Sequence, residues 1–467
     1  MVVSVAAPPT GTATSSAVGT MCRTGILISS LLIAAPSAAQ QLTIQGAQFA
    51  IDGNPRFLTF ITYFGALGAA DVATDLQFLH DVGFDGVRVM TNWRDSPKLM
   101  REDGSLNPDL VDRLLFILDR ARALRLVVDI TFNAEQVEGL DAARFRTAIL
   151  ATTVAVMAYD NVLFDIQNER DVYGPFFRSL SPANVAAIAA AIKAVDPSRI
   201  VTASNSPNTS PSDAARFTAD SGLDVTAYHD DRVRNWFDRG RLASIVDVLR
   251  TRGRPAYLQE PARFPFPSTD RADYFRLARE NAKRVGAAAW CFHTDLGFNL
   301  RDARFSDLLQ SRQEPEWAFV TSLIVRVQLR TADGYFLTAE SGGGLAVHAD
   351  RRQPGEWQTF VMTARDGGPV LDGDRITLRT SDGRHYLQAS FGGSDLLTAA
   401  GTIEGSWETF VIETGRDAPV GDGDACRLRT TSDPAWYASA DAGGGGDVHV
   451  NQRSAGRWET FSVVGAW

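Results

Sequence analysis

The stretch VLFDIQNERDVYG (residues 162–174) is an apolar run that ends with an amide and a carboxylate side by side. A short run as apolar as Val162 to Ile166 is typical of a strand that is buried on both faces in a parallel sheet. Burial of such a strand does not require Asn168 and Glu169 at its end. The stretch therefore predicts a core strand whose carboxyl end presents polar side chains for another purpose.

Seven other short apolar runs occur between residues 57 and 292, and amphipathic helical patterns separate them. Two of these patterns have clear helix starts, at Asn107-Pro108 and Ser181-Pro182, where a capping side chain precedes a proline. Eight strands that alternate with helices predict a (β/α)₈ barrel. A doubly wound open sheet is the alternative, but no glycine-rich phosphate turn follows the first strand. The other runs are FLTFITYF (57–64), GVRVM (86–90), LVVDITF (126–132), IVTAS (200–204), DVTAY (224–228), AYLQE (256–260) and AAAWCF (287–292).

Near residue 324 the helical periodicity ends, and turns rich in glycine and aspartate take over. The hexapeptides GEWQTF, GSWETF and GRWETF place Trp357, Trp407 and Trp458 at intervals of 50 and 51 residues. Three β-rich units of this length predict a β-trefoil. Over residues 325–467 the chain resembles the fascin-like trefoils. We expect the three tryptophans to pack at a repeated core position.

The chain thus divides into a leader over residues 1–39, a barrel domain over 40–323 and an all-β trefoil domain over 324–467. In the leader, Arg23 precedes the apolar stretch ILISSLLIAA (26–35), which is too short to span a bilayer. Small residues then mark a cleavage position. This pattern predicts a secreted or periplasmic protein, and a membrane anchor is the alternative.

The composition excludes several classes of partner. A net charge of −9 argues against nucleic acid or an anionic membrane, whereas neutral or basic substrates remain open. The three cysteines form no CxxC or Cys/His cluster, which argues against a structural zinc site. Cys291 and Cys426 lie in different predicted domains, so we expect no disulfide between them.

Polar side chains follow most of the predicted barrel strands. Catalytic residues of such barrels gather at the C-terminal ends of the strands, so this clustering indicates an active site. The candidates are Arg88 in the second run, Asn133 after the third, Asn168 and Glu169 after the fourth, Tyr228 and His229 after the sixth, Glu260 at the end of the seventh and Trp290 in the eighth.

Glu169 and Glu260 end the fourth and seventh strands, which lie on opposing sides of a barrel mouth. Glycoside hydrolysis needs two facing carboxylates: one donates a proton to the leaving oxygen, and the other attacks the anomeric carbon or activates water. Their environments must hold the two pKa values apart. Arg88 would keep the Glu260 carboxylate charged if it approaches that residue.

With these residues the barrel resembles the retaining glycoside hydrolases of clan A, and most of all family 5, which contains cellulases and mannanases. The resemblance implies that Glu169 is the acid/base and Glu260 the nucleophile. In the family an aromatic residue and a glycine usually follow the nucleophile, whereas this chain has PARF there.

The same resemblance implies roles for the other candidates. Asn168 would bond the substrate 2-hydroxyl, His229 and Tyr228 would orient the glutamates, and Trp290 would stack on the sugar ring. The family usually has a histidine at the end of strand three, where this chain has Asn133. These departures leave the substrate open between β-glucan and β-mannan types.

The hypothesis is a secreted retaining glycosidase that acts on a β-linked polysaccharide or oligosaccharide. Because the chemistry needs only carboxylates, we expect no metal or other cofactor. The trefoil would bind a polysaccharide or a cell-surface glycan. The alternatives are an adhesion protein with an inactive barrel and a transglycosylase that uses the same covalent intermediate. Aromatic residues in the loops after strands are candidate sugar platforms: Trp93, Phe176, Trp236 and Phe264.

Overall fold

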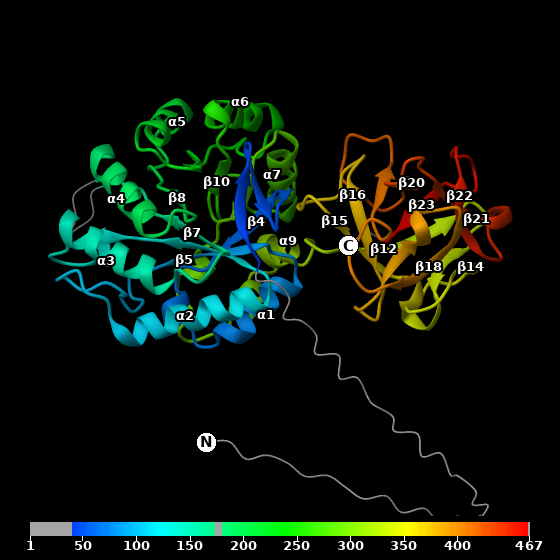
Figure 1. Cartoon of the computed structure of the whole chain (residues 1–467), viewed down its shortest axis with the longest axis horizontal. Helices are drawn as coiled ribbons and strands as arrows, with labels where there is room; N and C mark the ends of the chain where they lie inside the picture. Colours follow the sequence, from blue (N-terminus) through cyan, green and yellow to red (C-terminus); the bar gives the residue numbers. More distant parts are fainter. Residues whose placement is uncertain (1–39, 173–179, 466–467) are drawn as a thin grey trace, which may run out of the picture. The chain divides into compact units, whose positions relative to one another are not determined.

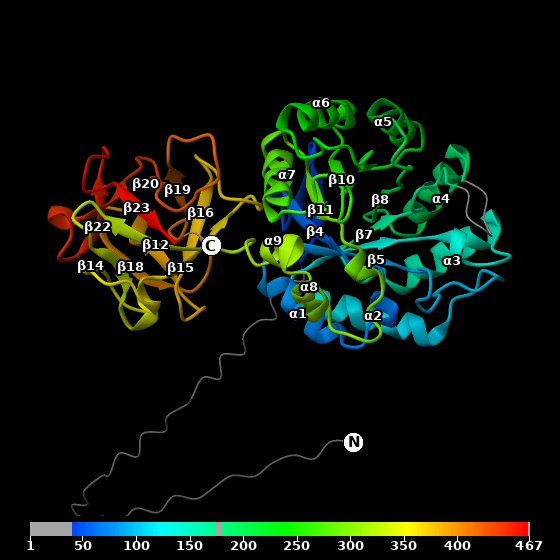
Figure 2. The same cartoon turned by 180° about the vertical axis from the view of Figure 1, so that it is seen from behind.

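The computed structural model describes residues 40–172 and 180–465, and the expected leader lies outside this part of the chain. Eight parallel strands form one sheet in the order β8-β7-β6-β5-β4-β11-β10-β9, which is chain order around a ring (Figures 1 and 2). A backbone hydrogen bond of 2.9 Å from Asp224 to Val201 joins β8 to the segment before β9. The barrel prediction is confirmed, and the doubly wound alternative is wrong. The strands are β4 (Leu58–Thr62), β5 (Gly86–Met90), β6 (Val127–Thr131), β7 (Val162–Asp165), β8 (Ile200–Thr202), β9 (Thr226–His229), β10 (Ala256–Glu260) and β11 (Ala289–Phe292).

A helix follows each barrel strand and covers its outer side (Figure 1). Both helix starts expected from the sequence are confirmed. The Asn107 side chain accepts from the Asp109 amide at 3.2 Å, and Ser181 accepts from the Asn184 amide at 3.2 Å. The helices are α1 (Val72–Asp81), α2 (Pro108–Ala123), α3 (Ala142–Ala155), α4 (Pro182–Val195), α5 (Pro211–Asp220), α6 (Arg239–Leu249), α7 (Ala272–Arg284) and α8 (Phe305–Ser311), followed by the short α9 (Ala318–Val320). None of the helices in the described residues is long and apolar enough to cross a membrane.

The barrel interior is apolar at its lower end, where the strands begin, and polar toward its mouth, where the strands end. Successive side chains on a strand point to opposite faces, so every second residue enters the interior. Phe60, Tyr257 and Cys291 form part of the apolar lower layer. The antiparallel strands β1 (Leu42–Gln45), β2 (Gln48–Ile51) and β3 (Asn54–Arg56) form a small separate sheet, and Leu42 and Phe49 from it join this layer.

Residues 325–464 form an all-β domain of twelve antiparallel strands with a threefold pattern of pairing. In each group of four, the first strand pairs with the fourth and the second pairs with the third. The fourth strand of one group then pairs with the first strand of the next, and β23 returns to β12. The groups are β12 (Val325–Thr331), β13 (Phe336–Ala339), β14 (Val347–Arg351) and β15 (Phe360–Ala364); β16 (Arg375–Arg379), β17 (Tyr386–Ala389), β18 (Asp395–Gly401) and β19 (Phe410–Glu413); β20 (Ala425–Thr430), β21 (Tyr437–Ala440), β22 (Val448–Gln452) and β23 (Phe461–Val464).

The repeated tryptophans do not pack in the core of this domain. Trp357, Trp407 and Trp458 are 38%, 40% and 48% exposed, so the expectation that they fill a core position is wrong. The phenylalanine three residues after each tryptophan fills the core instead, because it begins the fourth strand of its group and points inward. These core residues are Phe360, Phe410 and Phe461. Each repeat therefore presents one tryptophan to solvent.

Candidate active site

The carboxylates of Glu169 and Glu260 meet at the mouth of the barrel. Glu260 is the last residue of β10, and Glu169 lies four residues beyond the end of β7. One oxygen of each glutamate and one nitrogen of His229 all lie within 4.8 Å of one another. The Glu260 side chain is 6% exposed and that of Glu169 is 23% exposed. The two acids thus share one site but differ in their access to water.

Arg88 on β5 organises the floor of this site. Its side chain is fully buried, and its Nη1 donates to Glu260 Oε1 at 2.5 Å. Its Nη2 donates to Asn168 Oδ1 at 2.8 Å and to Asp165 Oδ2 at 3.2 Å. Its Nε donates to the Thr131 hydroxyl at 3.0 Å. One guanidinium therefore fixes Glu260 and the Asn168 amide relative to each other.

A second network fixes the ring of His229, which is the last residue of β9. The Gln259 amide nitrogen donates to Asp129 Oδ2 at 2.9 Å and to Asp165 Oδ2 at 3.1 Å. The Gln259 oxygen therefore faces His229 Nε2 at 3.0 Å, which places a proton on that nitrogen. His229 Nδ1 then lies 3.2 Å from Glu169 Oε1 and 3.7 Å from Glu260 Oε2. The imidazole stands between the two acids.

The backbone at Glu169 adopts the left-handed conformation, with a φ of 45°. Residues other than glycine rarely hold this conformation unless their surroundings impose it, and such strain gathers at functional sites. Here the Ser204 hydroxyl accepts from the Glu169 amide at 3.0 Å and faces Asp165 Oδ2 at 3.3 Å. The Ser204 carbonyl accepts from the next amide, that of Arg170. This turn ends the strand and directs the Glu169 carboxylate into the mouth.

The charges around Glu260 keep it ionised. Burial alone would raise the pKa of this carboxyl, but the positive charges of His229 and Arg88 outweigh burial and hold it well below its usual range. The pKa of His229 is raised: burial opposes its charged form, and Glu260 and Glu169 favour that form more strongly. Burial, together with Arg263, Arg232 and Arg88, lowers the pKa of His293 to about 3 despite the nearby Glu260. His293 is therefore neutral at neutral pH.

Two candidates from the sequence lie outside the site. Tyr228 on β9 and Trp290 on β11 line one small void between the barrel and its helices, beside Trp236 and Leu258. The prediction that Tyr228 orients the glutamates and that Trp290 stacks on a sugar is therefore wrong. The reason is strand alternation: Ala289 and Cys291 of β11 face inward, so Trp290 between them faces the helices.

His293, which the sequence places just beyond the eighth strand without assigning it a role, takes the inward position beyond the end of β11. Its Nε2 lies 3.7 Å from Glu260 Oε2. Counting every second residue from Cys291 gives His293 this inward position. Ser204 and Gln259 were missed in the sequence, because a serine after one strand and a glutamine within another have no distinctive spacing.

Asn133 lies beside the site without contacting either candidate acid. Its side chain caps a short 3₁₀ turn (η2, Ala134–Gln136) by accepting from the Glu135 amide at 3.3 Å. It also lies 3.5 Å from the Gln167 amide nitrogen. The structure thus gives Asn133 the position of a residue that supports the end of β6.

An aromatic wall, formed by Phe64, Trp93 and Phe298, stands next to the acids. The Phe64 and Phe298 rings are stacked at 5.1 Å, and Trp93 meets both edge-on. Phe64 also lies 5.0 Å from the Arg88 guanidinium carbon. Of the loop aromatics expected to form platforms, Trp93 belongs to this wall. Trp236 is buried and Phe264 lies against Arg312, while Phe176 lies outside the described residues.

The donor atoms of Glu169, His229 and Glu260 are close enough to hold a cation. However, Arg88 lies 2.5 Å and Arg232 lies 3.5 Å from the Glu260 oxygens. Two guanidinium groups on one carboxylate repel a cation, so the donor set favours chemistry by the carboxylates themselves.

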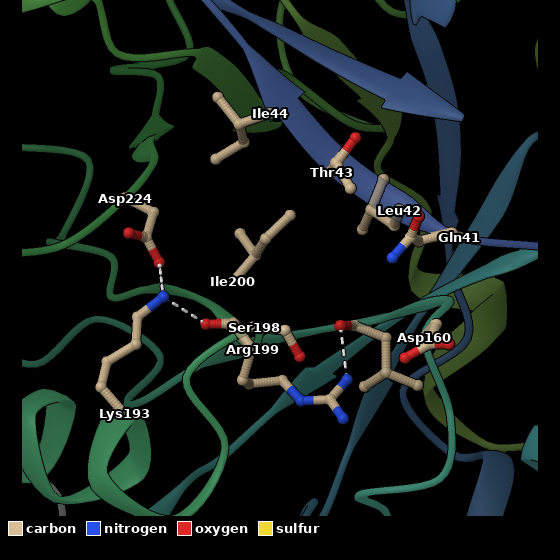
Figure 3. A pocket seen from close by; sticks show the side chains of 11 residues that line it. Gln41, Leu42, Thr43, Ile44, Asp160, Lys193, Ser198, Arg199, Ile200 and Asp224 are labelled. Carbon is tan, nitrogen blue, oxygen red and sulfur yellow. Dashed lines mark hydrogen bonds and ion pairs between the residues drawn. The ribbon is translucent and has the colours of Figure 1, made fainter. Parts of the chain in front are cut away.

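A separate cavity of about 280 Å³ lies at the opposite, N-terminal end of the barrel (Figure 3). Three of its charged groups, Lys193, Arg199 and Asp224, are paired with one another or with the backbone. Lys193 Nζ lies 2.7 Å from Asp224 Oδ2 and donates to the Arg199 carbonyl at 2.6 Å. Arg199 donates to the Val162 carbonyl at 2.7 Å. This cavity therefore lies at the end of the barrel opposite Glu169 and Glu260, and its lysine and arginine are held by neighbouring groups.

The fold and the site define a (β/α)₈ barrel with paired carboxylates at its C-terminal mouth, joined to a threefold all-β domain. No family model matches the sequence, and no curated protein matches it. Solved structures to which this chain is similar include β-mannanases. One, from Thermomonospora fusca, is 13% identical, with 55% of this chain and 84% of that one covered and a TM-score of 0.42.

Two further β-mannanase structures are similar at the same level. The β-mannanase of the blue mussel Mytilus edulis is 15% identical, with 59% of this chain and 96% of that one covered and a TM-score of 0.43. The β-1,4-D-mannanase of Cryptopygus antarcticus is 12% identical, with 59% and 94% covered and a TM-score of 0.44. Similarity this low does not determine activity, so function has to be inferred from the site.

Proposed function

We propose that the barrel is a retaining glycoside hydrolase that cleaves a β-linked polysaccharide or oligosaccharide of the glucan or mannan type. The observation that carries the proposal is the approach of Glu169 and Glu260 to within 4.8 Å. Retaining enzymes hold their two carboxyl groups about 5–5.5 Å apart, whereas inverting enzymes leave a wider gap of about 6.5–9.5 Å for water. The short separation favours a covalent intermediate.

The environments of the two acids assign their roles. Glu260 is buried and held ionised by Arg88, so it is the nucleophile that attacks the anomeric carbon. Glu169 is more exposed and has no guanidinium within ion-pair distance among the described residues, so it exchanges protons with water and acts as acid/base. The Glu169 proton passes to the leaving oxygen as the glycosyl ester forms. Glu169 then takes a proton from the water that hydrolyses the ester.

The neighbouring groups position the reactants. The side-chain oxygen of Asn168 accepts from Arg88, so its amide nitrogen can donate to the sugar 2-hydroxyl. His229 bridges the two carboxylates and stabilises the charge that moves between them as the reaction proceeds. Phe64 supplies an apolar surface at the mouth in place of the expected Trp290.

Substitution of each acid tests the proposal on aryl β-glycosides. Glu260→Gln should lose activity by about a thousandfold or more, because the covalent step cannot begin. Glu169→Gln should keep a fast first step with an activated leaving group, and added azide should restore turnover as a β-glycosyl azide. Glu138→Gln, a change at an exposed glutamate of the loop after β6, is the matched control. Equal turnover by Glu260→Gln and wild type would refute the proposal.

We further propose that the C-terminal domain is a β-trefoil of the fascin-like type that binds glycan. The twelve strands in three groups of four support the trefoil, and the solvent-exposed tryptophans support glycan binding. Replacing Trp357, Trp407 and Trp458 together by alanine should reduce sedimentation with insoluble mannan or cellulose and leave turnover of a soluble aryl glycoside unchanged. Equal sedimentation would remove this role.

Export from the cell is likewise a proposal, and it rests on the leader pattern of residues 1–39 alone. Amino-terminal sequencing of the protein from the culture medium or periplasm should begin at Gln40.

A further inference from the structure

Three arginines form a row at the mouth of the barrel. Arg94, Arg232 and Arg263 lie in the loops after β5, β9 and β10, at the end of the barrel that carries Glu169 and Glu260. Two aromatic rings link their guanidinium groups. The Phe298 ring lies 5.4 Å from the guanidinium carbons of both Arg94 and Arg263.

The second ring completes the row. Phe266 lies 5.2 Å from the guanidinium carbon of Arg263 and 4.8 Å from that of Arg232. Contacts of this kind orient a guanidinium and leave its N–H groups free to bond. The row therefore consists of three positioned charges with apolar surface between them.

The row begins at the reacting acids. Arg232 Nη2 lies 3.5 Å from Glu260 Oε2. Phe298 belongs to the aromatic wall, and its ring lies 6.1 Å from that of His293. A sugar chain that enters the site therefore passes the guanidinium groups close to the bond that is cleaved.

Two of the three charges in the row are not neutralised within the described residues, whereas Arg232 faces Glu260. Neither Arg94 nor Arg263 forms an ion pair there, and the nearby Asp295 is bonded to Arg312 at 2.7 Å. The buried Nε of Arg232 has no hydrogen-bond partner in this part of the chain. Burial, together with the charges of Arg232 and Arg94, lowers the pKa of Arg263. Holding like charges together costs free energy that a bound anion would recover.

We propose that the substrate is an acidic β-linked glycan, whose carboxylate or sulfate groups are bound by Arg94, Arg263 and Arg232. This inference rests on the proposed function and specifies its substrate class. Guanidinium groups bind carboxylate and sulfate oxygens through paired N–H donors, and the intervening rings pack against sugar faces. A neutral glucan or mannan would leave this charge uncompensated.

Binding to a variant that does not turn over tests the proposal. Calorimetry with the full chain carrying Glu169→Gln would compare three tetrasaccharides: β-1,4-linked mannuronate, its carboxyl-reduced counterpart mannotetraose, and 6-O-sulfated mannotetraose. The first two differ only in the charged group. At least one acidic ligand should bind about tenfold or more tightly than the neutral one, because charge-assisted hydrogen bonds are stronger than neutral ones. The preference should fall as salt rises, and the tighter of the two acidic ligands identifies carboxylate or sulfate.

Arginine variants show whether the row is responsible. In the double variant Arg94→Gln/Arg263→Gln the preference should shrink to within about twofold, with an unchanged thermal midpoint as evidence of folding. Arg234→Gln, a change at an exposed arginine two residues from Arg232, is the matched control and should keep the preference. Equal binding of neutral and acidic ligands, or a preference that survives the double variant, would overturn the proposal.

The outcome is separable from that of the proposed function. Retaining hydrolysis of mannotetraose by the wild type without tighter acidic binding would defeat the substrate assignment and leave the glycosidase standing. Tight, arginine-dependent binding in a protein whose Glu260→Gln variant is as active as wild type would support the acidic ligand and defeat the glycosidase assignment.

Discussion

The guanidinium of Arg88 on β5 reaches Oε1 of Glu260 at the end of β10 across 2.5 Å, three strands away around the barrel. The same guanidinium holds Asn168 and Asp165 from β7 and its extension. Because both groups lie within the barrel, little solvent screens their attraction. Arg88 therefore both positions the polar groups at the mouth and keeps the candidate nucleophile Glu260 ionised.

Replacement of Arg88 by lysine should therefore affect both stability and the pH profile. A lysine keeps the charge but cannot bridge Glu260, Asn168 and Asp165 at once. We expect a loss of up to about 3 kcal/mol in the free energy of unfolding. The pKa of Glu260 should also rise toward its usual value, which moves the acid limb of kcat/KM to higher pH. Urea titration and a pH–rate profile measure the two effects, and an acid limb that stays in place would contradict the role of Arg88.

Replacement of Ser204 by alanine should relax the strained turn at Glu169. The change removes the acceptor of the Glu169 amide and a partner of Asp165. A buried donor left without a partner costs about 1–3 kcal/mol. Chemical denaturation should show this loss, and kcat should fall more than KM changes, because the acid/base is no longer held in place. Ser244→Ala, on the exposed side of α6, is the control, and equal kinetics for the two variants would argue against the positioning role.

The corrected positions of the tryptophans predict opposite results for two substitutions. Trp290→Phe should lower stability by about 1–3 kcal/mol, because it opens space in the packed layer between barrel and helices, and should leave KM within about twofold of wild type. Trp93→Phe changes the aromatic wall at the mouth and should raise KM with little effect on stability. Thermal unfolding and steady-state kinetics distinguish the two. A raised KM in Trp290→Phe alone would restore the original assignment of a sugar platform to Trp290.

Buried His293 should make stability depend on pH in the acidic range. Its pKa is about 3 in the folded protein, against an unperturbed value of 6.5. Between these values the unfolded chain binds a proton that the folded chain does not, so stability falls as pH falls below 6.5. The slope approaches about 1.4 kcal/mol per pH unit. In His293→Asn the loss of stability between pH 6.5 and 4 should be smaller by as much as about 3 kcal/mol. Denaturation curves at several pH values measure it, and parallel losses in both proteins would contradict the assignment.

The sequence predicted the fold in some detail. Apolar runs and capped helices specified all eight barrel strands, because burial on both faces leaves a pattern that local composition shows directly. The runs overestimated the length of β7, which ends at Asp165 because the chain turns sharply at Asn168 and Glu169. The threefold repeat likewise predicted three β-rich units, but it did not show which aromatic residue of each hexapeptide is buried.

The sequence by itself determined the barrel, the repeats and the two glutamates, because each depends on spacing along one strand or on one strand end. Only the tertiary structure decided which side chains share the mouth. Tyr228 and Trp290, which were expected in the site, lie outside it. The site instead contains His293, Ser204, Gln259 and three arginines from separate loops. The contacts at the mouth join residues far apart in the chain; Arg88 and Glu260, for example, are 172 positions apart. The physical reason is that strand alternation and barrel closure set the direction of each side chain, and neither is a property of a single stretch of sequence.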